Sequence, residues 1–253
     1  MTDGLSPEPP YLTIGLYLDR YTDADGLQAT VDALIAAGSR PTGFSWAGPP
    51  VGDEGFEYVS DLELARGAWP VTRPGLRAYR IGFEVEDLDE VAVTYAGAKP
   101  PERHPVVLHL SAGVFGIPEE HWSTEEHGEA DEYRGTVSGL LLSLVDSLDP
   151  GYAVVGIERP VPTPRRLVDG ETLPTDLYVS GRVWTVDAEV PGLLREAYVD
   201  GAVREAAHGT LYSDWLLRSN AFLAPPATIG RRAAAALGHA LLRMEGTLAA
   251  RPS

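Results

Sequence analysis

The chain has 253 residues, 44% of them hydrophobic, and a formal net charge of −17. This length suits one large domain or two packed lobes, and it can bury enough surface to fold without disulfides or a structural metal. No residue is a cysteine, which excludes disulfides, thiolate nucleophiles and iron–sulfur clusters. The negative charge argues against nucleic acid and anionic membranes as partners, because both repel an acidic surface.

Residues 1–10 are polar and rich in proline, and they predict a flexible tail. They show neither the basic nor the apolar region of a secretory signal, and no apolar stretch approaches the roughly 18 residues that span a bilayer. We therefore predict a cytoplasmic protein with a single globular domain over 11–253. A division into two lobes, 11–150 and 151–253, is compatible with the pattern.

The first elements follow from apolar spacing. Alternation over 11–18 predicts a strand, and helical spacing over 24–37 predicts a helix with Thr22 near its N-terminus and Gly38 after its C-terminus. Residues 39–75 are rich in Gly and Pro and predict a long loop region with short elements.

An antiparallel sheet with one wet face is predicted next. Its strand candidates are 76–86, 91–95 and 106–110. A strongly amphipathic helix follows from Tyr133 to Leu148, and Gly135 and Gly139 within it predict the close approach of another element.

The second half continues this mixed order. It predicts a buried strand at 152–157, a loop at 159–174, a strand at 177–184, a helix at 191–206, a strand beginning at 209 and a last helix over 229–248. Because strands and helices do not alternate strictly, the fold class is predicted as α+β, with a mostly antiparallel or mixed sheet and packed amphipathic helices.

Two acidic runs are the densest polar features. The candidate binding residues in them are Glu84, Glu86, Asp87, Asp89, Glu90, Glu119, Glu120, Glu125, Glu126 and Glu129. The plain interpretation is a solvated turn for the first run and a solvated loop leading into a helix N-terminus for the second, where carboxylates favour the helix dipole. The alternative is a surface that faces a cationic partner. Whether the runs form one surface is left open.

Motifs for cofactor chemistry are absent from the sequence. There is no phosphate-binding loop, no dinucleotide fingerprint and no HExxH zinc motif, so no cofactor or metal is expected. His109 and Ser111 lie two apart on a predicted strand, but the glycine pattern of a nucleophile elbow is missing. Arg165 and Arg166 could hold an anion, although solvation or pairing with acidic groups is the simpler interpretation.

We therefore expect a protein-binding module that sequesters or inhibits a basic partner, as an immunity-type protein blocking a toxic nuclease would. Charge reversal at Glu125 and Glu126 should then slow partner binding and leave the fold intact. The alternative is a small-molecule enzyme that uses histidines as general acids or bases in a cleft. Its candidates are His104, His109, His121, His127 and His208. A third option is an assembly role in which the last helix forms an oligomer contact.

Overall fold

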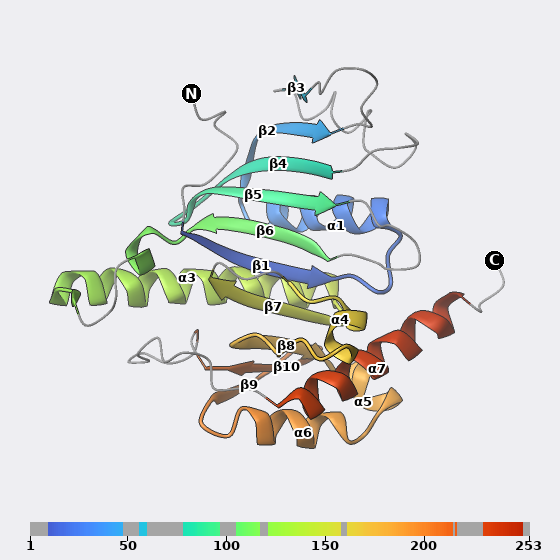
Figure 1. Cartoon of the computed structure of the whole chain (residues 1–253). Helices are drawn as coiled ribbons and strands as arrows, with labels where there is room; N and C mark the ends of the chain where they lie inside the picture. The colour runs from blue at the N-terminus through green and yellow to red at the C-terminus, as the bar shows by residue number, and fades with distance from the viewer. Residues whose placement is uncertain are drawn as a thin grey trace.

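A single antiparallel sheet organises the protein. The computed structural model describes residues 10–47, 56–59, 78–96, 105–116, 121–157, 161–214, 216 and 230–249. Within them, ten strands follow the order β3-β2-β4-β5-β6-β1-β7-β8-β10-β9, and every neighbouring pair is antiparallel (Figure 1). This arrangement, with its packed helices, confirms the predicted α+β class.

The elements have the following bounds. The strands are β1 Tyr11–Tyr17, β2 Arg40–Ala47, β3 Phe56–Val59, β4 Ala78–Val85, β5 Asp89–Ala96, β6 Val106–Ser111, β7 Tyr152–Ile157, β8 Asp176–Ser180, β9 Ala202–Ala206 and β10 Gly209–Ser213. The helices are α1 Asp23–Ala36, the 3-10 helix η2 Gly113–Gly116, α3 Thr124–Leu148, α4 Pro164–Val168, α5 Gly181–Val186, α6 Val190–Ala197 and α7 Arg231–Ala249.

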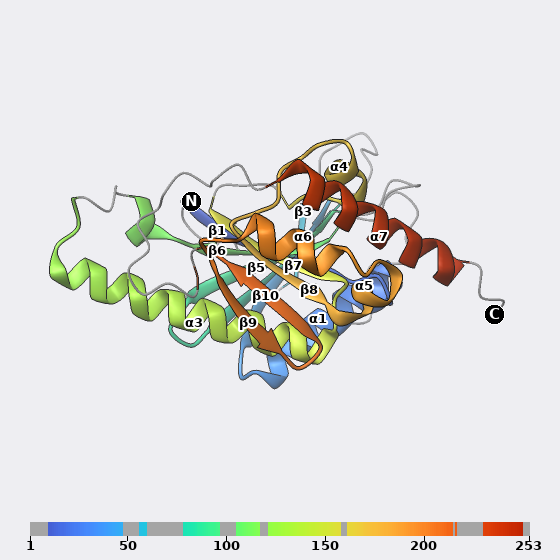
Figure 2. The same ribbon diagram turned by 90° about the horizontal axis from the view of Figure 1, so that it is seen from below.

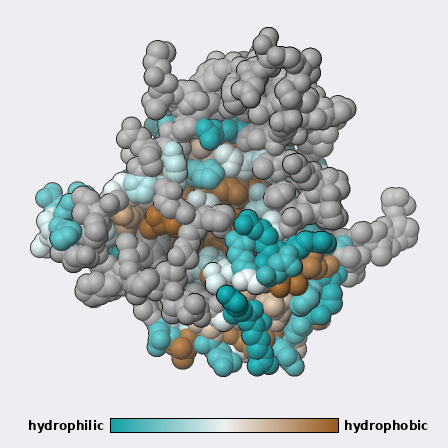
Figure 3. Space-filling model, in the orientation of Figure 1, coloured by the Kyte–Doolittle hydropathy of each residue, from teal (hydrophilic) through white to brown (hydrophobic). Residues whose placement is uncertain are grey.

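Two hydrophobic cores lie on opposite faces of the sheet. On one face, α1 and α3 cover the buried alternate residues of β1, such as Ile14, which registers with Leu108 on β6 and Val155 on β7. On the other face, α4 to α7 cover β7, β8 and β10 (Figures 1 and 2). In Figure 3, the lower right, where these later helices pack, shows mainly hydrophilic groups with some hydrophobic ones between them. The helical layer thus turns its polar side outward.

One ion-pair network joins the two halves of the chain. The guanidinium of Arg182 donates to both oxygens of Asp19, at 2.6 and 3.0 Å, and to an oxygen of Asp149 at 3.0 Å. It also donates to the backbone oxygen of Asp149 at 2.6 Å, and Arg20 pairs with Asp149 at 2.7 Å. Because Asp19 follows β1 and Asp149 ends α3, one arginine fixes three segments. The proposed lobes share one sheet, and their division stays a prediction.

The predicted strand over 177–184 is wrong in its second part. The strand β8 ends at Ser180, and α5 starts directly after it. The Ser180 hydroxyl accepts from the backbone N–H of Arg182 at 3.3 Å, which caps the new helix. The turn that results brings Arg182 to Asp19 and Asp149, so tertiary ion pairing overrides the local strand pattern.

The predicted helix over 191–206 is also too long. Helix α6 ends at Ala197, and the chain returns as β9. The buried Tyr198 donates its hydroxyl to the Pro174 oxygen at 2.6 Å, and Gly201 lies where an added Cβ would be 2.8 Å from the backbone oxygen of Ser213. This crowded turn requires glycine and stops the helix.

Two smaller predictions are corrected as well, and short elements are present in the region 39–75 as predicted. The predicted loop over 159–174 contains α4, whose first turn is capped by the Thr163 hydroxyl. The region 39–75 contains β2 and β3, and its other residues after Ala47 lie outside the described ones. No other element approaches Gly135 or Gly139 closely in the described part of the chain, since an added Cβ would meet nothing within 4 Å at either position.

Candidate functional site: an acidic hollow

The first acidic run folds as a hairpin rather than as one turn. Glu84 belongs to β4, whereas Asp89 and Glu90 belong to β5, so the predicted turn covers only the middle of the run. The backbone N–H of Leu88 donates to the Val85 oxygen at 3.1 Å and closes the tip. Asp87 has a φ of 62°, in the left-handed region that Asp and Asn tolerate better than most residues. Its side chain is therefore held at the hairpin tip, exposed to solvent.

The second acidic run lies mostly inside α3. Ser123 and Glu126 form a reciprocal capping box, so the helix begins at Thr124, earlier than predicted. The Ser123 N–H donates to the Glu126 carboxylate at 2.6 Å, and this bond lowers the pKa of the Glu126 carboxyl below its usual range. Glu126 thus has a structural role, and reversing its charge would also remove half of the cap.

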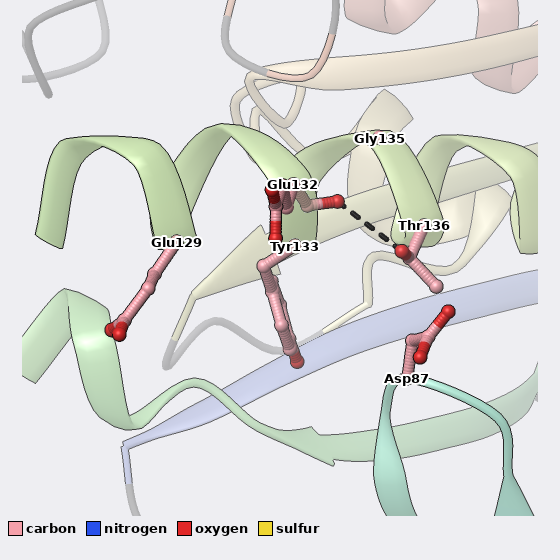
Figure 4. Close-up of a pocket in the computed structure, with 6 residues that line it drawn as sticks. All are labelled: Asp87, Glu129, Glu132, Tyr133, Gly135 and Thr136. Atoms are coloured by element: carbon pink, nitrogen blue, oxygen red, sulfur yellow. Dashed lines mark hydrogen bonds between the residues drawn. The ribbon is translucent and has the colours of Figure 1, made fainter. Parts of the chain in front are cut away.

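The two acidic runs meet in one hollow of about 650 Å³. The described residues that line it are Asp87, Glu129, Glu132, Tyr133, Gly135 and Thr136. Figure 4 shows Asp87 reaching from the hairpin toward α3, opposite Thr136, whose hydroxyl donates to the Glu132 backbone oxygen at 3.2 Å. The hairpin tip and the helix therefore place carboxylates from separate parts of the sequence around one recess.

Tyr133 anchors this part of α3 to the sheet. Its hydroxyl donates to the backbone oxygen of Ser111 at the end of β6, and its ring packs edge-on against Phe115 at 5.7 Å. Trp122 is buried beside Phe115, as expected for a core aromatic. The helix segment that carries Glu129 and Glu132 is thus fixed relative to the sheet.

The carboxylates of the hollow differ from other acidic groups in their pairing. Within the described residues, Asp87, Glu129 and Glu132 take part in no ion pair. In contrast, Glu84 pairs with Arg40 at 2.8 Å. Uncompensated carboxylates in a recess make it a place of negative potential that attracts cations.

Of the ten predicted binding residues, the hollow gathers Asp87 and Glu129. Glu86 and Glu125 are exposed beside the same elements but do not line it. Glu119 and Glu120 lie outside the described residues. The sequence reasoning did not single out Glu132, Tyr133 and Thr136 as binding residues. Their spacing from Glu129, at i+3, i+4 and i+7, is the signal for one helix face.

The candidate histidines have other surroundings. His109 shares a hydrogen bond with Thr94 at 3.1 Å, and His127 with the Ser123 backbone oxygen at 2.8 Å. His121 and His208 are exposed, and His104 lies outside the described residues. Of the four candidate histidines in the described part of the chain, none lines the hollow. Across the described ranges, no group of three His, Asp or Glu could hold a metal ion, and no helix is long and apolar enough to cross a membrane.

Arg165 and Arg166, which the sequence placed in a loop, lie on α4. Arg166 forms an ion pair with Glu171 at 2.8 Å, and both Arg165 and Arg166 are exposed. The simpler interpretation of Arg166, pairing with the chain's excess acid, matches this geometry.

Comparison with known proteins adds little. No family model matches the chain, and no curated protein matches it. Among solved structures, it is similar to the Pseudomonas aeruginosa T6SS protein PA0821, with a TM-score of 0.39 and 12% sequence identity, over 92% of this chain and 75% of that one. Likeness at this level carries no conclusion about function.

Proposed function

We propose that this protein is a binding module that sequesters or inhibits a basic protein partner, in the manner of an immunity-type protein. One observation carries the proposal: Asp87 from the β4–β5 hairpin and Glu129 and Glu132 from α3 line the same recess. The lack of cysteine favours a reducing compartment, and we propose the cytoplasm as the place of binding.

Charge on this protein acts on a basic partner both at a distance and at contact. A net charge of −17 attracts a basic partner from a distance and speeds its encounter. Carboxylates without intramolecular cations then offer acceptors for arginine or lysine at contact. A recess of several hundred Å³ is of the size that admits side chains or small groups. The net charge thus speeds the encounter with the partner, and the recess determines where the partner binds.

The test is capture by isosteric variants. Asp87→Asn combined with Glu129→Gln and Glu132→Gln removes three charges from the hollow and keeps the side-chain shapes. Asn also tolerates the left-handed backbone at position 87. The matched control, Glu189→Gln with Glu196→Gln and Asp200→Asn, removes three exposed charges on and beside α6.

Each immobilised protein is incubated with native lysate at low salt, and the retained proteins are identified by mass spectrometry. We expect the wild-type protein and the α6 control to retain the same basic protein in stoichiometric amount, and the hollow variant to lose most of it. Equal retention of the partner by all three proteins would mean that the hollow takes no part in binding. Failure of the wild-type protein to retain any basic protein would refute the function itself.

A further inference from the structure

The strand β9 forms one edge of the sheet. It pairs with β10 in an unbroken register from Ala202 to Ala206, and no described residue pairs with its other side. Figure 2 shows it as the outermost strand beyond β10. Its side chains are open to solvent, with Val203 46% exposed and Arg204 and Glu205 exposed as well.

The hairpin geometry decides which backbone groups face outward. The loop between β9 and β10 has two residues, 207–208, so the flanking pair Ala206 and Gly209 is the one that exchanges backbone hydrogen bonds. Alternation then turns the N–H and C=O groups of Arg204 toward β10 and those of Val203 and Glu205 away from the sheet. The edge therefore offers two donors and two acceptors in line.

Natural edge strands are commonly blunted by charged side chains, above all lysine, by proline, by a bulge or by short length. The strand β9 is short and carries two charges, but Arg204 and Glu205 have opposite signs, so they favour a partner of complementary pattern. The β9 sequence, Ala-Val-Arg-Glu-Ala, has neither lysine nor proline, and its register shows no bulge. It also exposes a valine, a residue that favours strands. We propose that β9 is a docking edge to which an extended segment of another protein adds an antiparallel strand.

A second copy of this chain fits the edge poorly. Two identical antiparallel strands are related by a two-fold axis perpendicular to the sheet. Because residues with outward backbone groups must oppose each other, the axis passes through a residue pair, and one residue faces its own copy. The registers centred on Arg204 and on Glu205 oppose like charges, which destabilises a pair. The register centred on Val203 sets Glu205 against Gly201, beyond the strand end. Two chains of −17 also repel each other.

The edge also defines the sequence of the occupant. In an antiparallel pair, a basic residue opposite Glu205 is followed by an acidic or small residue opposite Arg204, and then by an apolar residue opposite Val203. The expected pattern is basic, acidic, apolar. Because Glu205 and Val203 present the outward backbone groups, the basic residue of the segment exchanges backbone hydrogen bonds with Glu205, and the apolar residue exchanges them with Val203. This inference uses none of the residues of the acidic hollow.

The probe is a blocked synthetic peptide, Ser-Thr-Lys-Glu-Val-Thr-Ser, added to the isotope-labelled full chain. Binding should slow the hydrogen exchange of the Val203 and Glu205 amides about tenfold or more, and leave the Arg204 amide unchanged. N-methylation of the peptide at its lysine and valine should abolish this protection. N-methylation at its glutamate, whose N–H points away from β9, should preserve it.

A second arm uses the protein itself. Val203→Pro removes an outward N–H without breaking the ladder to β10, and Val203→Thr keeps that N–H as the matched control. The proline variant should lose peptide binding and the threonine variant should keep it. No protection at millimolar peptide would overturn the proposal, even if the proline variant fails to fold. Protection that appears without peptide and grows with protein concentration would assign the edge to a second copy and overturn it as well.

Discussion

Asp87 and Glu132 line the same recess, although Asp87 is at the tip of the β4–β5 hairpin and Glu132 lies on α3, which follows β6 and η2. The recess thus brings parts of the two acidic runs into one local surface. Charge reversal at Glu125 and Glu126 is a poor test of binding, because Glu126 stabilises the start of α3 through the capping box. If the proposed function holds, the residues whose neutralisation should weaken binding are those of the recess.

The Arg182 network should dominate the stability of the junction between the two halves. Arg182→Met leaves the buried Asp19 without its guanidinium, and we expect a loss of about 3 kcal/mol in the free energy of unfolding. The exposed pair Arg243 and Asp187 provides the control, and Arg243→Ala should cost less than about 1 kcal/mol. Urea denaturation measures both. Equal losses would show that the network has no special weight.

Glu245 should make stability fall as the pH rises. Burial raises the pKa of the Glu245 carboxyl, which accepts a hydrogen bond from the Tyr17 hydroxyl. The folded state therefore holds this proton more tightly than the unfolded state. The contribution is fully present below the unfolded pKa of 4.5 and is lost as the pH rises through the folded value.

Glu245→Gln keeps an acceptor for Tyr17 and removes the titration. Thermal unfolding between pH 4 and pH 8 should show a smaller decline for the variant than for the wild-type protein. Parallel curves for the two proteins would mean that Glu245 ionises at no cost in the folded state.

Two helix glycines should respond to alanine in opposite directions. At Gly139 on α3 an added Cβ meets nothing within 4 Å, so Gly139→Ala should stabilise by about 1 kcal/mol through helix propensity. At Gly238 on α7 the Cβ would lie 2.5 Å from the Pro164 backbone oxygen, so Gly238→Ala should destabilise by about 2 kcal/mol. Denaturation midpoints measured side by side test this, and a gain at both sites would contradict the close packing of α4 on α7.

Periodicity predicted the elements whose own side chains decide their structure. The alternation of Leu12, Ile14 and Leu16 predicted β1, and the apolar spacing around Val31 predicted α1. The early start of α3 was also readable, since Ser123 and Glu126 have the spacing of a capping box. In these places the local pattern and the fold agree.

The wrong predictions concern segments whose structure depends on contacts between residues that are distant in the sequence. Helix α5 replaces a predicted strand because Arg182 pairs with Asp19 and Asp149, far away in the sequence. For the same reason the hollow could not be predicted from the sequence. The register of β4 with β5 and the placement of α3 together bring Asp87 beside Thr136. Each acidic run was visible in the sequence, but their meeting is a tertiary property.

The most direct measurement is the association rate of the captured basic partner with the purified protein, followed across a range of salt concentrations. Neutralising the hollow with Asp87→Asn, Glu129→Gln and Glu132→Gln should lower the rate about tenfold at low salt and flatten its salt dependence, whereas the α6 control should match the wild-type protein within about twofold. An unchanged association rate in the hollow variant, or an equal loss in the control, would contradict the binding role of the hollow.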